Sequence, residues 1–274
     1  PLLSPRLQDL AQLARAVYRN AAIEALRLYV PTRAQPPILA PPMQRLTETV
    51  YPPTEPGAVQ MHPGLPRGAF TVMAQISVAA SEDFVIVGGH QDSWFGEAAT
   101  DNAAGNACIL ELARVFNQHK ELLRRGLVVG FWAGHETGTM VGSSWFVDRH
   151  WDRLRDHAAA YLQIDQPACV GTTRWGTRSN VELRGFHEAI ERRLCPGREH
   201  VWRRATKIGD ASFFGLGVPM MTGGGAFTEA ELKATALANL GWWHHSLECT
   251  IDKVDFNWMS DHRTLKQTEE ATHR

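Results

Sequence analysis

Residues 84–94 read FVIVGGHQDSW, and the fold class can be inferred outward from this segment. The unbroken apolar run at 84–89 is typical of a strand buried on both faces of a parallel sheet. Further strands are predicted at FTVMAQISVA (70–79), GLVVGFWAG (126–134), AAAYLQID (158–165) and VPMMTG (218–223). Helical periodicity is predicted over 103–119, 141–149 and 258–271. Strands that alternate with helices indicate an α/β fold whose largely parallel sheet is covered on both faces.

The composition is that of a folded globular protein. Apolar residues make up 44% of the 274 residues, charged residues 21%, and the net charge is −1. Because so small a net charge creates no strong electrostatic field, we expect neither a nucleic-acid nor a membrane partner. No run of about 18 apolar residues occurs, so no transmembrane helix is expected. We expect a soluble protein, either cytoplasmic or secreted, because four cysteines without a CxxC pair do not distinguish the compartments.

Proline divides the chain into two parts. Twelve of the fifteen prolines lie in the first 66 residues. An amphipathic helix is predicted over 5–29 and an irregular arm over 31–66, because proline-punctuated chain cannot pair as a central strand. We therefore expect an N-terminal helix and Pro-rich arm over 1–66 and one α/β domain over 67–274. The arm could cross to a second copy, so a homo-oligomer is a further hypothesis.

Polar side chains follow the predicted strands where ligands gather in open α/β sheets, outside the carboxyl ends. His90 follows the run at 84–89, Glu136 follows the run at 126–134, and Asp165 closes the run at 158–165. Asp101 lies in the loop that leads to the next helix. Imidazole and carboxylate groups are zinc ligands, and a pair of ions needs a carboxylate between them. Each residue alone has an ordinary structural explanation, such as a helix cap, but their joint placement favours a metal site.

Asp92 stands two residues after His90. A carboxylate close to a metal-binding histidine is expected to accept the other ring N–H and to fix the tautomer. The stretch at 84–94 therefore offers a ligand together with a residue that orients it.

Six blocks resemble, in order, those of the zinc exopeptidases with a co-catalytic metal pair, a family that contains aminopeptidases, glutamate carboxypeptidase and glutaminyl cyclase. The blocks are GGHQDSW (88–94), ATDNAAGNACILELARVF (99–116), VVGFWAGHETGTMVGSSWF (128–146), YLQID (161–165), GDASFFGLGVPMM (209–221) and WWHHSLECTIDKVD (242–255). The resemblance covers roughly residues 70–270. It implies a phosphorylase/hydrolase-like three-layer sandwich with a central, mostly parallel mixed sheet, and makes 67–274 a zinc-hydrolase catalytic domain.

The resemblance also implies two zinc ions per chain and the ligands that hold them. His90 and Asp165 would hold one ion, Glu136 and His245 the other, with Asp101 between them. His245 is preferred to its neighbour His244 because it stands four residues before Cys249-Thr250, where the family has an Asp-Thr pair.

Position 135 departs from the family, which usually has Glu-Glu where this chain has His135-Glu136. Three readings stay open: His135 replaces the glutamate as general base, His135 binds metal, or hydrolysis is reduced or lost. Under the first, catalytic residues His135 and Asp92 support a metal-dependent hydrolase that cleaves an amide bond in a peptide or small amide, as an aminopeptidase or a specialised amidohydrolase. The alternative is a binding or scaffold protein.

Other residues near the predicted site loops are candidates for substrate contacts. Asp210 lies in the block at 209–221, and Arg174 and Arg178 could bind a carboxylate. An aromatic specificity pocket or simple packing would explain four tryptophans, Trp94, Trp175, Trp242 and Trp243.

Overall fold

The computed structural model describes residues 71–94, 96–194, 197–206, 209–235 and 237–259. The predicted helix over 5–29, the Pro-rich arm, and residues 260–271 of the last predicted helix lie outside these ranges. The predicted domain boundary near residue 66 lies outside them too.

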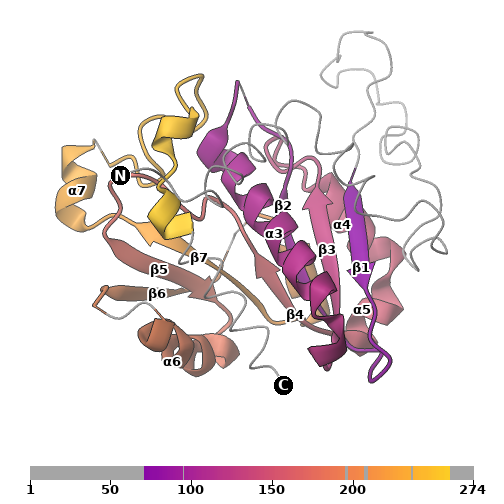
Figure 1. Ribbon diagram of the computed structural model, residues 1–274. Helices are drawn as coiled ribbons and strands as arrows, with labels where there is room; N and C mark the ends of the chain where they lie inside the picture. Colours follow the sequence, from indigo (N-terminus) through magenta and orange to yellow (C-terminus); the bar gives the residue numbers. More distant parts are fainter. Residues whose placement is uncertain (1–70, 95, 195–196, 207–208, 236, 260–274) are drawn as a thin grey trace, which may run out of the picture.

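Seven strands form one mixed sheet in the order β1-β3-β2-β4-β7-β5-β6 (Figure 1). β1 and β5 run antiparallel to their neighbours β3 and β7, whereas the other four strand pairs are parallel. The strands are β1 (Val72–Ile76), β2 (Phe84–His90), β3 (Gly126–Trp132), β4 (Ala158–Gln163), β5 (Arg174–Ser179), β6 (His200–Arg204) and β7 (Met220–Ala226).

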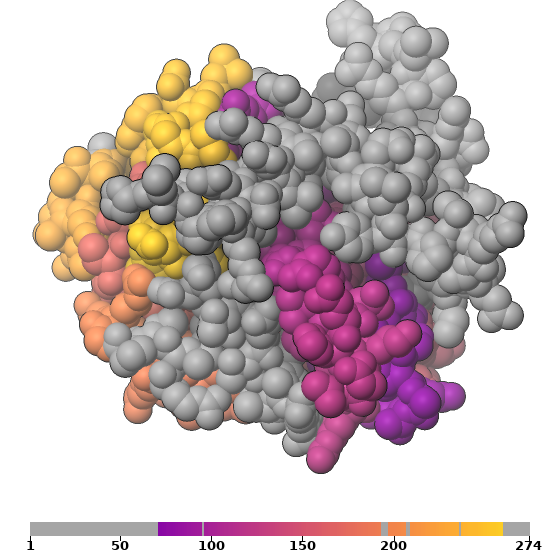
Figure 2. Space-filling view, viewed as in Figure 1, coloured from indigo at the N-terminus to yellow at the C-terminus, as the bar shows by residue number. Residues whose placement is uncertain are grey.

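Helices cover both faces of this sheet. The helices are α3 (Ala104–Gln118), α4 (Val141–Arg149), α5 (Trp151–His157), α6 (Arg184–Leu194) and α7 (Glu229–Ala234). One core cluster joins α3 and α6 to the sheet, and a second joins α4 and α5 to its other face. In the space-filling view, α3 lies at the surface beside β1 (Figure 2). The predicted three-layer sandwich with a mostly parallel mixed sheet is therefore confirmed.

The pleat of β2 explains why its sequence is apolar throughout. Val85 and Val87 belong to the cluster that contains α3, whereas Phe84 and Ile86 belong to the cluster that contains α4 and α5. Successive side chains of a strand point to opposite faces, so a strand covered on both faces needs apolar residues at every position. All seven residues of β2 are buried.

The predicted elements at 84–89, 103–119, 126–134, 141–149 and 158–165 are confirmed as β2, α3, β3, α4 and β4. The strand at 70–79 is shorter than predicted, and that at 218–223 begins and ends later, as β7. Five elements were not predicted, namely α5, β5, α6, β6 and α7. β5 reads RWGTRS and β6 reads HVWRR, so neither shows the apolar run that marks the central strands. Among the described residues, no helix combines the length and the apolarity needed to cross a bilayer.

Candidate metal centre

Three neighbouring strands deliver the predicted site residues to one edge of the sheet. β2 lies between β3 and β4 and runs parallel to both, so their carboxyl ends meet at the same edge. His90 is the last residue of β2, Glu136 follows β3, and Asp165 follows β4. Asp101 lies in the buried segment Ala99–Ala103, directly before α3.

The carboxylate of Asp101 lies between two groups of side chains. On one side, Nε2 of His90 lies 3.0 Å from Oδ1 of Asp101 and 3.3 Å from Oδ1 of Asp165. On the other side, Nε2 of His245 lies 3.2 Å from Oδ2 of Asp101 and 3.0 Å from Oε2 of Glu136. The structure thus brings all five predicted ligands together, in two pairs with Asp101 between them.

This donor set fits metal ions by three observations. Ligand atoms that share a tetrahedral ion at about 2.0 to 2.2 Å lie roughly 3.3 to 3.6 Å apart, close to the separations found here. Potential ligand atoms also gather within 4.8 Å of one another in overlapping groups. Finally, buried carboxylate oxygens at Asp101 (Oδ2), Glu136 (Oε1) and Asp165 (Oδ1) have no hydrogen-bond partner among the described residues. An unsatisfied buried carboxylate oxygen is costly, and a cation would remove that cost.

His244 lies at the same carboxylate, although sequence reasoning had set it aside in favour of His245. Its Nε2 is 3.1 Å from Oδ2 of Asp101, and its ring stacks on that of His245 with 3.6 Å between centroids. Of the two histidines, His245 also contacts Glu136, with 3.0 Å between its Nε2 and Oε2. His244, Asp101 and His245 form one of the groups that could hold a metal ion.

Asp92 contacts the loop after β3 through its carboxylate. Oδ1 accepts the backbone N–H of His135 at 3.2 Å, and Oδ2 accepts that of Glu136 at 2.9 Å. Nδ1 of His90 instead lies 2.9 Å from the backbone oxygen of Asp92, and 3.9 Å from its Oδ1. The expected carboxylate contact with His90 is therefore replaced by a main-chain contact, because the two amides of the loop occupy the carboxylate.

The ring of His135 is fixed between His90 and Asp210. It stacks on the ring of His90 with 3.9 Å between centroids, and its Nδ1 lies 2.9 Å from Oδ2 of Asp210. Because an ionised carboxylate can only accept, Nδ1 carries the proton and the neutral ring keeps a lone pair at Nε2. That Nε2 faces the site, 3.9 Å from Oδ2 of Asp165. At Gly209 a Cβ would stand 1.8 Å from the ring, so only glycine leaves room for it.

Asp210 is fully buried, and its other oxygen accepts the hydroxyl of Ser143 at 2.8 Å. The sequence offered no link between His135 and Asp210, which are 75 residues apart. The only signal was the position of Asp210 in a block that resembles the family.

In the metal-free chain, burial and neighbouring charges shift the pKa values of the site residues. Burial by itself lowers the pKa of His90, but the charge of Asp165 and the hydrogen bond to Asp101 outweigh it and raise this pKa well above its usual value. Burial, followed by the charge of Asp101, raises the pKa of Glu136 to about 7. Burial opposes ionisation of Asp101, yet the nearby imidazole rings of His244 and His90 hold its pKa below the usual range. Protons thus occupy positions that a cation would take.

The four tryptophans differ in their distance from this centre. Trp175 is fully buried, stacks on Trp258 and donates its N–H to Glu191, so its suggested role in a specificity pocket is wrong. Trp243 is buried as well. Trp94 is half exposed, and its ring centroid lies 5.3 Å from that of His245. Trp94 therefore borders the centre, and it lines a small hollow together with Asp101 and Glu136.

Comparison with known proteins connects this geometry to a family. The sequence model of peptidase family M28 matches residues 71–184. Aminopeptidase NAALADL1 of Mus musculus is 31% identical over 107 residues, which are 36% of this chain and 14% of that protein. A probable glutamate carboxypeptidase of Arthroderma benhamiae is 32% identical over 93 residues, or 33% of this chain and 13% of that protein.

The fold is similar to that of a zinc aminopeptidase from Bacillus subtilis, with a TM-score of 0.62 at 16% identity over 74% of this chain and 49% of that one. The chain spans only a small part of the length of the curated relatives it matches. The matched segment nevertheless includes four of the five converging side chains, all except His245. Residues 71–184 thus match the sequence model of peptidase family M28, and the fold around the converging side chains is similar to that of a zinc aminopeptidase.

Proposed function

We propose that this chain is a metal-dependent hydrolase that cleaves an amide bond in a peptide or a small peptide-like molecule. The observation that carries the proposal is the convergence of five potential ligands whose buried carboxylate oxygens lack partners. The catalytic domain would be residues 67–274. The relatives named above as aminopeptidase and glutamate carboxypeptidase support peptide-bond hydrolysis as the reaction class.

Zinc is the metal that these donors fit best, since imidazole and carboxylate are its usual ligands together with thiolate. We infer two ions per chain, one held by His90 and Asp165 and one by Glu136 and His245, with Asp101 shared. When bound, such a pair polarises the substrate carbonyl and makes water acidic enough to attack near neutral pH. His244 would compete with the second ion for Oδ2 of Asp101.

His135 would act as the general base. Its Nδ1–H donates to Asp210, which leaves the lone pair of Nε2 directed at the metal centre. Nε2 can then take a proton from the attacking water and return it to the leaving nitrogen, work that contributes about 10²- to 10⁴-fold to rate. Asp210 keeps the proton of the neutral ring on Nδ1, so that Nε2 can take up and return a proton. It also stabilises the imidazolium that forms, as the aspartate of a serine-protease triad does.

Asp92 would position the loop that carries both functions. Its carboxylate binds the main chain of His135 and Glu136 together, so it sets the general base and a metal ligand relative to each other. A charged acceptor bound to two backbone amides is a strong and directional restraint.

The second reading of His135, as a metal ligand, is favoured by one observation. His90, His135 and Asp165 form one of the groups whose ligand atoms lie within 4.8 Å. Substitution separates the two roles. If His135 is the general base, His135→Ala should keep both ions. If His135 is a metal ligand, the same substitution should lose one ion.

Turnover of a panel of dipeptides and aminoacyl anilides by the full chain tests the proposal. We expect hydrolysis in the presence of zinc, loss of hydrolysis with a chelator, and recovery when zinc is restored. Lys120→Gln, at an exposed position just after the end of α3 that is opposite to Asp101, should leave turnover unchanged. A chain that binds zinc at the five residues and hydrolyses no amide would favour the scaffold alternative.

A further inference from the structure

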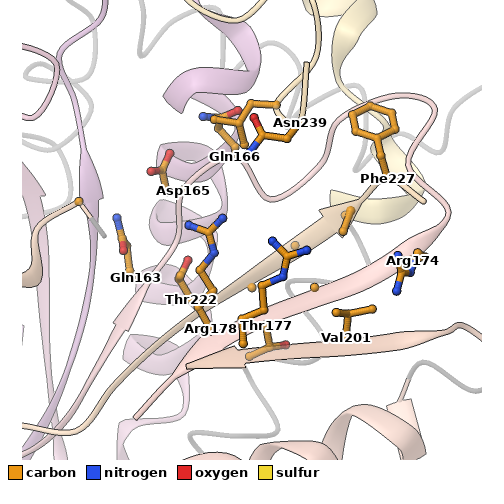
Figure 3. A pocket seen from close by; sticks show the side chains of 18 of the residues that line it. Gln163, Asp165, Gln166, Arg174, Thr177, Arg178, Val201, Thr222, Phe227 and Asn239 are labelled. Carbon is orange, nitrogen blue, oxygen red and sulfur yellow. The ribbon is translucent and has the colours of Figure 1, made fainter. Parts of the chain in front are cut away.

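A cavity of about 360 Å³ lies beside the candidate metal centre, over β5, β6 and β7. Asp165 and Gly209, which contact the centre, belong to its lining. Figure 3 shows Asp165, Gln166 and Asn239 along one side of the cavity and Thr177, Arg178 and Val201 along the other. A substrate whose scissile bond reached the metal centre would therefore extend another of its groups into this cavity.

Glycines leave the floor of the cavity open. Gly223, Gly224 and Gly225 of β7 line it, and Gly176 of β5 pairs with Gly224 across the sheet. Gly176 and Gly224 lie on the face that carries Arg178, so the strands present only backbone to the cavity there, whereas a Cβ at Gly223 or Gly225 would meet Thr177 or Thr172 instead. The longest side chains in the lining, those of its arginines, therefore determine which chemical group the cavity accepts.

Two of these arginines form a cross-strand pair. Arg178 of β5 and Arg203 of β6 are register partners on parallel strands, so both side chains project from the same face of the sheet. Both residues are exposed and both line the cavity. Like charges on neighbouring strands destabilise a sheet. Among the residues that the structure describes, neither guanidinium has a hydrogen bond or an ion pair.

Arg174 provides the contrast within the same cavity. Its Nη2 donates to Oε1 of Glu199 at 2.7 Å, so its charge is already compensated. On sequence alone Arg174 and Arg178 are equivalent candidates, but the structure separates a paired arginine from an unpaired one and adds Arg203.

We propose that Arg178 and Arg203 bind a carboxylate of the substrate, so that the enzyme prefers acidic peptides or peptide-like amides. The proposal rests on the proposed function for the position of the scissile bond. Guanidinium groups match carboxylates through paired hydrogen bonds, and one anion between two cations relieves their repulsion. The carboxylate belongs either to an acidic side chain or to the free C-terminus of the substrate, and both present the same chemistry to the arginines.

Four matched substrates distinguish these sources: Ala-Glu, Ala-Gln, Ala-Glu-amide and Ala-Gln-amide. Zinc-loaded wild type should cleave the substrates that carry the recognised carboxylate with a kcat/KM about 10- to 100-fold above that for Ala-Gln-amide, as expected for charge-assisted hydrogen bonds. If Ala-Glu-amide keeps the preference, the side chain is recognised. If Ala-Gln keeps it, the C-terminus is recognised.

Arg178→Gln and Arg203→Gln should each remove most of that preference while they leave Ala-Gln-amide within about twofold. Arg204→Gln is the matched control, because the next residue along β6 projects from the opposite face. It removes the same charge and should leave the preference unchanged.

Binding of N-acetyl-L-glutamate, compared with N-acetyl-L-glutamine by isothermal titration calorimetry, adds a readout that needs no turnover. Arg-dependent binding of the glutamate probe without hydrolysis would support the carboxylate site and contradict the proposed function. Hydrolysis with no carboxylate preference, or a preference that survives both arginine substitutions, would overturn the carboxylate site and leave the proposed function standing.

Discussion

Asp210→Asn tests the role of His135 with the least change in shape. Asp210 is fully buried and accepts two hydrogen bonds, from Nδ1 of His135 at 2.9 Å and from the hydroxyl of Ser143 at 2.8 Å. The amide keeps the volume but removes the charge, and its NH₂ group can face the ring. His135 would then accept at Nδ1 and carry its proton at Nε2, where a base needs a lone pair.

The size of the effect follows from the bond that is lost. A hydrogen bond to a charged group contributes roughly 1.5 to 3 kcal/mol. Since about 1.4 kcal/mol is a factor of ten in rate, kcat should fall about 10- to 100-fold or more. The assay is kcat at saturating substrate, with bound zinc and the melting temperature measured on the same preparation.

Ser143→Ala is the control for this substitution. It removes the second hydrogen bond to Asp210 and leaves the contact with His135, so kcat should change by only about threefold or less. An Asp210→Asn enzyme that is folded and zinc-loaded and retains full kcat would refute the reasoning, because the tautomer of His135 would then not matter.

Three further predictions concern the same centre. His135→Ala should lower kcat by at least about 100-fold with two ions retained, and loss of one ion by metal analysis would make His135 a ligand instead. Asp92→Ala should lower both kcat and zinc affinity, because two backbone amides lose their acceptor; an effect on only one of the two would contradict a shared positioning role. Zinc binding should release protons and weaken as pH falls below about 7, because the raised pKa values of His90 and Glu136 let protons compete with metal. Calorimetry in buffers of different ionisation enthalpy counts the released protons. A count of zero near pH 6 would contradict competition between protons and zinc.

The same pKa shifts predict how the metal-free chain responds to pH. A carboxyl group whose pKa rises on folding, as Glu136 does to about 7, stabilises the fold below its unfolded pKa and loses that contribution as pH rises. The raised pKa of His90 acts in the same direction, because its contribution is present below the unfolded value and is lost as pH rises through the folded one. The melting temperature of the metal-free chain should therefore fall between about pH 6.5 and 8, above the range in which the lowered pKa of His150 acts in the opposite direction, and zinc should reverse the trend. A melting temperature that rises with pH in the metal-free chain would contradict these shifts.

The sequence predicted the centre of the sheet well because burial on both faces leaves a strong signal. β2, β3 and β4 are apolar at nearly every position, and their ends fix where His90, Glu136 and Asp165 lie. Strands β5 and β6 carry no such signal, because buried positions of β5 alternate with arginines and a glycine, and β6 has no fully buried position and ends in two arginines. Their register, and with it the Arg178–Arg203 pair, depends on tertiary contacts that no local pattern encodes.

Side-chain partners were the least predictable part of the site. Asp92 is close to His90 in sequence, yet its carboxylate binds the loop 43 and 44 residues further on. Asp210 reaches His135 across 75 residues. Spacing along the chain can place a carboxylate near a site, but only packing decides which donor it accepts from.

The two-ion site is tested by the zinc content per chain of wild type and of Asp101→Ala, measured by plasma mass spectrometry after loading and dialysis. The carboxylate of Asp101 lies between the two pairs of ligands. The account predicts two zinc ions in the wild type and at most one in the variant, with amide hydrolysis lost in parallel. A wild type that retains no zinc, or a variant that retains both ions and full activity, would contradict it.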